Sequence, residues 1–89
     1  IVFNTEKSRY ELEIDGRIVY ADVHKDAGNI LYIDYVFSPP ELRGKGAAGE
    51  FMNALMNEIE KKGFKAKPIC GYAASWLKKH ELEYSALIA

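Results

Sequence analysis

The segment Leu42–Gly49 separates two kinds of sequence pattern. Ahead of it, apolar and polar residues alternate as they do in strands, whereas after it apolar residues recur at helical spacing. The segment contains three glycines, which allow the backbone to adopt positive φ and to approach a ligand closely. The first amides of the following helix lack intrahelical partners, and Arg43 and Lys45 add positive charge. We therefore predict that this segment, the glycine loop, binds an anion such as phosphate.

Four segments ahead of the glycine loop have the pattern of strands. In residues 8–14 and 17–25, apolar and polar side chains alternate, and Asp15-Gly16 between them is a strong signal for a two-residue hairpin turn. Residues 30–37 are almost wholly apolar, so we expect a central strand that is covered on both faces. Residues 1–3 are expected to add a short edge strand.

A helix, a strand and a second helix are expected after the glycine loop. Residues 46–62 carry apolar side chains at spacings of three and four, and Gly63 is expected to cap this helix. Residues 64–69 form the next predicted strand, which a crossover connection places parallel to the strand before the loop. Residues 72–80 are predicted to form the second helix. The tail, residues 81–89, is expected to be irregular or to form a last short strand.

Length and composition limit the function classes. The 89 residues suffice for one core, so residues 1–89 are predicted to form a single α+β domain whose mixed sheet combines an antiparallel meander, a crossover helix, a parallel strand and a second helix. A formal net charge of −1 argues against nucleic-acid binding. No apolar run approaches the roughly 20 residues of a membrane span, and no signal-peptide pattern occurs, so a cytoplasmic protein is expected. The single cysteine, Cys70, excludes an internal disulfide and a cysteine-based zinc site, and no metal is expected.

The spacing Gly44-x-Gly46-x-x-Gly49 also matches the fingerprint of dinucleotide-binding folds. In those folds the glycines follow the first strand of a βαβ unit, and an acidic residue ends the next strand. Here antiparallel strands come first and the next strand ends in Ile69-Cys70, which disfavours a nicotinamide site. A Walker loop is excluded because no Gly-Lys-Ser/Thr follows at the required spacing. A plain connection between strand and helix, without a ligand, stays open.

The same loop contains the pattern Arg43-x-x-Gly46-x-Ala48, after an antiparallel meander and at the start of a helix. This pattern resembles the acetyl-CoA signature of the GCN5-related N-acetyltransferases, Gln/Arg-x-x-Gly-x-Gly/Ala. Three longer segments resemble, more narrowly, the short acetyltransferase-like proteins of the YjdJ type: Pro39 to Gly46, Pro68 to Tyr72 and Trp76 to His80. The resemblance covers residues 8–85.

The resemblance implies that acetyl-CoA is the cofactor and that the reaction is N-acetyl transfer to an amine. The cofactor's pyrophosphate would lie on the amides of the glycine loop, and its pantetheine would run between the strands at 30–37 and 65–69. The residues that the resemblance assigns to the cofactor are Val36, Phe37, Ser38, Arg43, Gly44, Lys45, Gly46, Ala47, Ala48 and Gly49. A non-catalytic module that binds CoA or acyl-CoA is the alternative.

Cys70 and Tyr72 are the catalytic candidates. Cysteine is often an inert core residue, but Cys70 ends a strand and precedes a helix, where the helix N-terminus and Lys67 favour a thiolate. The resemblance places this cysteine near the cofactor sulfur, as a transient acetyl acceptor or as a wall of the acyl pocket. Tyr72 would act as the acid towards the leaving thiolate. Tyr35 and Tyr84 are further candidates, although a packing role also fits each of these tyrosines.

Three other polar residues are weaker candidates for a functional role. His80 resembles a histidine of the short group, but the His-Pro-Glu-Tyr ending of that group is replaced here by His80-Glu81-Leu82-Glu83-Tyr84, so a solvated histidine at a helix end is expected. His24, within a strand, is expected to be incidental. Asp34 lies in the central strand, where it either orients an amine in the cleft or reaches solvent.

The sequence lacks the segments that form the acceptor pocket in the larger acetyltransferases. The larger acetyltransferases have helices before the hairpin and strands after the second helix that form the acceptor pocket, and this sequence has no counterpart of them. Three alternatives stay open. In the first, the acceptor site is exposed and takes a peptide or protein amine. In the second, a partner chain completes the site, for example in a homodimer. In the third, catalysis has been lost.

Overall fold

Strand-forming sequence ahead of the glycine loop produces four antiparallel strands. The computed structural model describes all 89 residues. The strands are β1 (Val2–Asn4), β2 (Arg9–Ile14), β3 (Arg17–Lys25) and β4 (Ile30–Phe37), and neighbours in this order are hydrogen bonded. Asp15 and Gly16 have φ of 51° and 74°, which two-residue hairpins of this kind require. The predicted meander is therefore confirmed.

The glycine loop leads into the longest helix of the chain. A 3₁₀ turn, η1 (Pro40–Leu42), opens the loop, and α1 (Ala47–Lys61) follows it. Gly63, two residues beyond the helix, has a φ of 73°. Its amide donates to the carbonyl of Glu60, and the amide of Phe64 donates to that of Ile59. These two bonds form the Schellman motif, so the cap predicted at Gly63 is confirmed.

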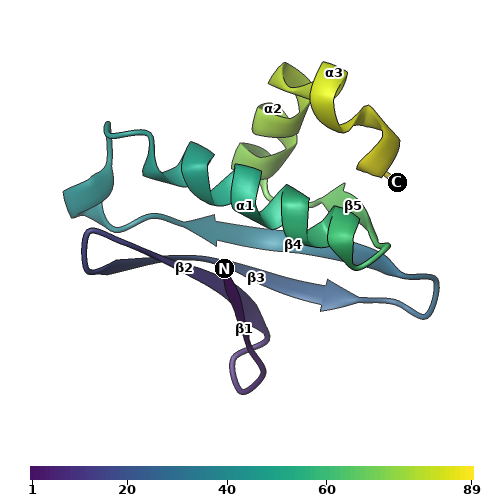
Figure 1. The fold of residues 1–89 in the computed structure, drawn as a ribbon, viewed down its shortest axis with the longest axis horizontal. Coiled ribbons are helices and arrows are strands. Elements are labelled where there is room, and N and C mark those ends of the chain that lie inside the picture. The colour runs from purple at the N-terminus through teal and green to yellow at the C-terminus, as the bar shows by residue number, and fades with distance from the viewer.

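After α1 the chain adds one parallel strand and further helical segments. Strand β5 (Lys65–Pro68) pairs with β4 in parallel, which makes a five-stranded mixed sheet in the order β1-β2-β3-β4-β5. Helix α2 (Gly71–Lys79) begins directly beyond β5. In Figure 1, α1 lies along the sheet, and α2 and α3 stand near its β5 end. The α+β class and the predicted order of elements are confirmed.

The C-terminal tail is more regular than expected. It forms the short helix α3 (Glu81–Tyr84) and a 3₁₀ turn, η2 (Ser85–Leu87). Ile88 then makes a single parallel bridge to Ala66, and the amide of Ala89 donates to the carbonyl of Ala66 at 2.8 Å. The tail thus covers the free edge of β5, which would otherwise expose unpaired backbone groups.

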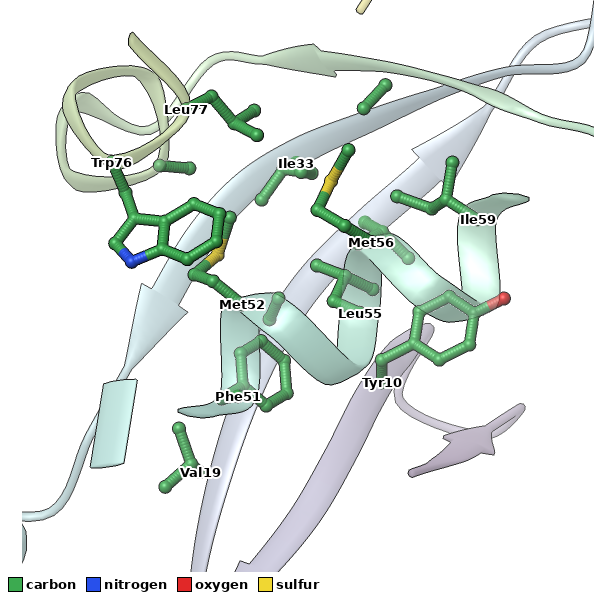
Figure 2. Close-up of a cluster of buried hydrophobic side chains, with 14 of the residues drawn as sticks. Tyr10, Val19, Ile33, Phe51, Met52, Leu55, Met56, Ile59, Trp76 and Leu77 are labelled. Carbon is green, nitrogen blue, oxygen red and sulfur yellow. The ribbon is translucent and has the colours of Figure 1, made fainter. Parts of the chain in front are cut away.

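The core lies between the sheet and one face of α1. The helix contributes residues three and four positions apart, as its apolar periodicity requires. They are Ala47, Phe51, Met52, Leu55, Met56 and Ile59, all buried. Figure 2 shows Phe51 next to Val19 of β3, and Met52 and Met56 between Ile33 of β4 and Trp76 of α2. Packing against α1 therefore positions both β4 and the start of α2.

The prediction that β4 is covered on both faces is wrong. Leu31 and Ile33 are buried beneath α1. On the other face of the strand, Tyr32 is half-buried and Tyr35 is exposed. No helix covers this second face of the sheet. Its aromatic side chains instead cover one another in cross-strand pairs, as in the stacking of Tyr20 on Phe37 at 5.1 Å between ring centroids. The aromatic composition of β4 thus reflects an uncovered face, which we call the open face.

Candidate functional site

Strands β4 and β5 separate at Ile33. Its carbonyl accepts hydrogen bonds from the amides of both Ile69, at 2.9 Å, and Cys70, at 3.0 Å. The last paired residues of the two strands are Ile33 and Pro68, and proline has no amide to continue the ladder. The rest of β4, residues 34–37, therefore has no partner on its β5 side. This free edge offers backbone donors and acceptors to a ligand.

The glycine loop presents a second set of free backbone groups. Gly44 and Gly46 have φ of 81° and 77°, a region that side-chain-bearing residues rarely adopt. The first hydrogen bond of α1 joins the amide of Glu50 to the carbonyl of Gly46 at 3.0 Å. The amides of residues 47–49 precede that bond and have no acceptor in the chain, so they form the positive end of a 15-residue helix.

Two adjoining hollows connect the glycine loop with the free edge of β4. The first has a volume of about 230 Å³ and is lined by Ser38, Leu42, Arg43, Gly44, Gly46, Ala47, Ala48, Gly49 and Tyr72. The second has a volume of about 210 Å³ and is lined by Tyr35, Val36, Phe37, Ser38, Arg43, Ala48 and Tyr72. They share four residues, so we describe them as one groove, the loop–edge groove.

The wall shared by the two hollows holds an unpaired polar atom. The Ser38 hydroxyl oxygen is buried and has no hydrogen-bond partner in the chain. Arg43 donates from Nε to the carbonyl of Ser38 at 3.3 Å, which leaves its terminal nitrogens without a protein acceptor. A buried hydroxyl without a partner is uncommon in proteins and is costly. The groove therefore supplies donors that only a ligand or solvent can satisfy.

The sequence-based assignment of cofactor residues can be compared with this groove. Every residue that the resemblance assigned to the cofactor lines it except Lys45. Lys45 is exposed, and its amide donates to the carbonyl of Leu42 at 3.2 Å, so the residue belongs to the outer turn of the loop. Three lining residues were outside that set: the buried Leu42, and Tyr35 and Tyr72, both of which are catalytic candidates.

Tyr72 lines both hollows from the first turn of α2. Its side chain stays partly accessible, with 42% of its surface exposed. Burial of the ring raises the pKa of the Tyr72 phenol above its ordinary value of 10.0, and the negative charge of Cys70 raises it further. The phenol is thus protonated at neutral pH and able to donate a proton into the groove.

Cys70 lies beside the groove rather than in its lining. It occupies the N-cap position of α2, is half-buried and packs against the main core. Tyr72 follows it by two positions, in the first turn of the same helix. The geometry therefore suits a wall behind Tyr72 better than a residue at the centre of the groove.

Two of the weaker candidates have structural roles. Tyr84 is buried and donates its hydroxyl hydrogen to Asn53 Oδ1 at 2.7 Å, so it does not reach the groove. His80 stacks on Trp76 with 3.9 Å between ring centroids, and its Nδ1 lies 2.8 Å from the Trp76 carbonyl. The expectation of a solvated His80 is therefore wrong, because the ring is held against α2.

One contact was missed from the sequence. On the open face, His24 Nδ1 lies 2.7 Å from Asp34 Oδ2, so the histidine that we expected to be incidental is paired. The two residues are ten positions apart, in different strands. Their contact depends on the register of β3 and β4, which no local sequence pattern specifies.

Comparison with known protein families identifies the family of the chain. The model of the family described as GCN5-related N-acetyl-transferase matches residues 9–87. The chain belongs to this family. Members of the GCN5-related family generally bind acetyl-CoA, and the antiparallel strands ahead of the loop exclude the dinucleotide-binding arrangement. No curated protein matches the sequence significantly. Membership of the narrower YjdJ-type group stays a prediction.

This GCN5-related chain has neither a helix suited to a membrane nor a cluster of side chains suited to a metal ion. None of its helices combines the length and apolar character needed to cross a membrane. No group of three or more His, Cys, Asp and Glu side chains is arranged to hold a metal ion.

Replacing Gly46 by alanine is expected to lower the free energy of unfolding by about 1–2 kcal/mol, because an L-residue is strained at its φ of 77°. Gly71→Ala is the matched control. Gly71 lies in α2 without positive φ, and an added Cβ would meet no atom within 4 Å. That control should be neutral or stabilising by up to about 1 kcal/mol. Urea unfolding measures both values, and equal losses would contradict the strained loop.

Proposed function

We propose that this chain transfers an acetyl group from acetyl-CoA to an amine. The observation that carries the proposal is the loop–edge groove. It joins a helix N-terminus with free amides to the unpaired edge of β4, at the point where β5 turns away. An anionic group at one end and a linear chain of amides along the edge match these two surfaces.

The residues of the groove fit the cofactor. The amides of residues 47–49 and the side chain of Arg43 would hold its phosphates, because both offer donors without protein acceptors. The unpaired Ser38 hydroxyl and the backbone of residues 36–38 would bind the amide-bearing arm. When bound, the cofactor supplies an activated acyl group as a thioester.

Tyr72 and Cys70 would serve the acyl end. The Tyr72 phenol lies in the groove and is protonated at neutral pH, so it would give its proton to the sulfur that leaves. Cys70, half-buried beside it at the start of α2, would form a wall of the acyl pocket or accept the acyl group transiently. Tyr35, exposed on the free edge, would border the place where the amine enters.

Two measurements test the proposal. Calorimetry with CoA measures binding, and release of free CoA from acetyl-CoA in the presence of primary amines and peptides measures turnover. Saturable binding with amine-dependent release would support the enzyme. Saturable binding without such release would favour the non-catalytic CoA-binding module, and an absence of CoA affinity would contradict both. Light scattering of the purified chain tests whether a second copy completes the acceptor side.

Arg43 and Lys45 form a matched pair for the binding measurement. Arg43→Ala is expected to weaken CoA binding by about tenfold, which corresponds to about 1.4 kcal/mol, because Arg43 lines both hollows. Lys45→Ala removes the same formal charge outside the groove, so its effect should stay below about threefold at physiological salt. Equal losses would mean that the loop acts by net charge alone and that the groove does not seat the cofactor.

A further inference from the structure

The pair His24–Asp34 stands on the open face where β4 is irregular. Asp22 of β3 pairs with Tyr35, whereas Val23 pairs with Ile33, so Asp34 is an extra residue in β4. Such a β-bulge redirects a side chain and often lies beside an active site. Here it brings the Asp34 carboxylate to 2.7 Å from His24 Nδ1 on the neighbouring strand.

The bulge coincides with the end of the loop–edge groove. On one side of Asp34, the Ile33 carbonyl holds the amides of Ile69 and Cys70 where the two strands separate. On its other side, the Tyr35 side chain lines the groove. Asp34 is therefore one residue from the strand separation and one residue from the groove, but it belongs to the face that the helices leave uncovered.

The imidazole of His24 is held in one orientation. A carboxylate only accepts hydrogen bonds, so His24 Nδ1 carries the hydrogen that is donated to Asp34, and Nε2 keeps a lone pair. One ring face stacks on Tyr32, with 4.6 Å between centroids and an interplanar angle of 0°. Tyr32 is itself fixed, because its hydroxyl donates to Asp26 Oδ2 at 3.1 Å. Nε2 has no protein partner, and 61% of the His24 side chain is exposed.

We propose that His24, oriented by Asp34, takes the proton from the acceptor amine, which would approach from the open face. This inference rests on the proposed acetyl transfer. An amine of the lysine type is an ammonium ion at neutral pH and has to lose a proton before it can attack. An imidazole is the side chain best suited to accept it at that pH, and a carboxylate behind the ring stabilises the resulting cation.

The proton balance assigns one role to each residue. His24 Nε2 takes one proton from the ammonium, and the freed lone pair forms the nitrogen–carbon bond as the carbon–sulfur bond breaks. The Tyr72 phenol protonates the departing sulfur and recovers a proton from the acylated nitrogen. His24 then releases its proton to solvent, which accounts for the single proton set free in each turnover. His24 is the catalytic residue in this scheme, and Asp34 is a positioning residue.

Charged groups around the pair act on an incoming ammonium ion. Asp34 and the stacked Tyr32 face His24 from β4. Asp22 lies two residues away on the same side of β3, and Lys67 of β5 is the register partner of Tyr32. The two aspartates attract an incoming ammonium, whereas Lys67 repels it from the far side of Tyr32.

The activity test compares His24→Gln with the wild type across pH. We expect kcat/KM of His24→Gln to fall about a hundredfold at neutral pH, within the range known for acid–base catalysis, and to recover as the amine deprotonates by itself. In the variant, the acidic limb of the profile should move to the higher pH range in which the amine itself deprotonates, while CoA affinity by calorimetry stays unchanged. His80→Gln is the control: it should keep the acidic limb, because His80 is held against Trp76.

A second readout needs neither cofactor nor turnover. Long-range ¹H–¹⁵N spectra of the free protein should show His24 protonated at Nδ1 and unprotonated at Nε2 at high pH, and Asp34→Asn should abolish this preference. Full activity with an intact acidic limb in His24→Gln, or the opposite tautomer, would overturn the inference. A wild-type chain without amine-dependent CoA release would overturn it together with the proposed function, whereas an active His24→Gln would overturn the inference alone.

Discussion

Replacing Leu55 by alanine is expected to lower the free energy of unfolding by about 2–5 kcal/mol. Leu55 is fully buried, with 0% of its surface exposed, on the α1 face that meets the sheet (Figure 2). The substitution removes apolar contacts and leaves a cavity that close-packed neighbours fill only in part. Small proteins are typically stable by about 5–15 kcal/mol, so this one change removes a large share of the total.

The chain contains a matched control for Leu55. Leu82 in α3 is fully exposed, at 101% of its reference surface, so Leu82→Ala deletes the same atoms without opening a cavity. Its effect on stability should lie within about 0.5 kcal/mol of zero. Urea unfolding followed by circular dichroism measures both variants. Similar losses for the two leucines would contradict the packing of α1 between the sheet and α2.

Local chemistry explains why most elements were predictable. The Asp15-Gly16 turn and the cap at Gly63 require positive φ, which glycine adopts readily, and the structure has both. The apolar periodicity of α1 likewise specified the helix face that packs on the sheet. The open face was not predictable, because aromatic residues such as Tyr20 and Phe37 look like core residues in a sequence. Whether a helix or a neighbouring ring covers them depends on the tertiary arrangement.

The candidate site likewise has one part that was predictable from the sequence and one part that was not. The glycine loop is contiguous in sequence, so its predicted anion binding follows from a few neighbouring residues and does not depend on how the strands pair. Lys45 was assigned to the cofactor although it does not line the groove, since sequence order alone does not show which residues of a loop face a cavity. The His24–Asp34 contact needs both the hairpin register and the bulge, and only the folded sheet supplies these.

Replacing Tyr72 by phenylalanine is expected to lower kcat about a hundredfold or more while CoA affinity stays within about twofold. The phenylalanine ring keeps the groove wall that Tyr72 contributes to both hollows, and the substitution removes only the hydroxyl. Loss of a general acid typically costs a factor of about 10²–10⁴. Calorimetry with CoA and single-turnover release of CoA separate the binding effect from the chemical one.

The same role for Tyr72 predicts how activity changes with pH. A phenol donates only while it is protonated, and burial raises the pKa of Tyr72 above 10.0. The group is therefore competent at all pH values below about 10, and activity that depends on it should decline only as the pH rises above that point. The phenylalanine variant should lack this alkaline limb. A limb that persists in it would show that another group donates the proton.

Cys70→Ala is the second variant at the acyl end, because Cys70 is the single thiol of the chain and lies two positions before Tyr72. If Cys70 is a pocket wall, this variant keeps turnover within about tenfold, since alanine leaves only a small void. Intact mass after incubation with acetyl-CoA then shows no acetyl adduct on the wild-type chain. An adduct that Cys70→Ala abolishes together with turnover would instead make the thiol the acetyl acceptor. Tyr72 would in that case protonate the sulfur in the first of two steps, and Tyr72→Phe should slow formation of the adduct.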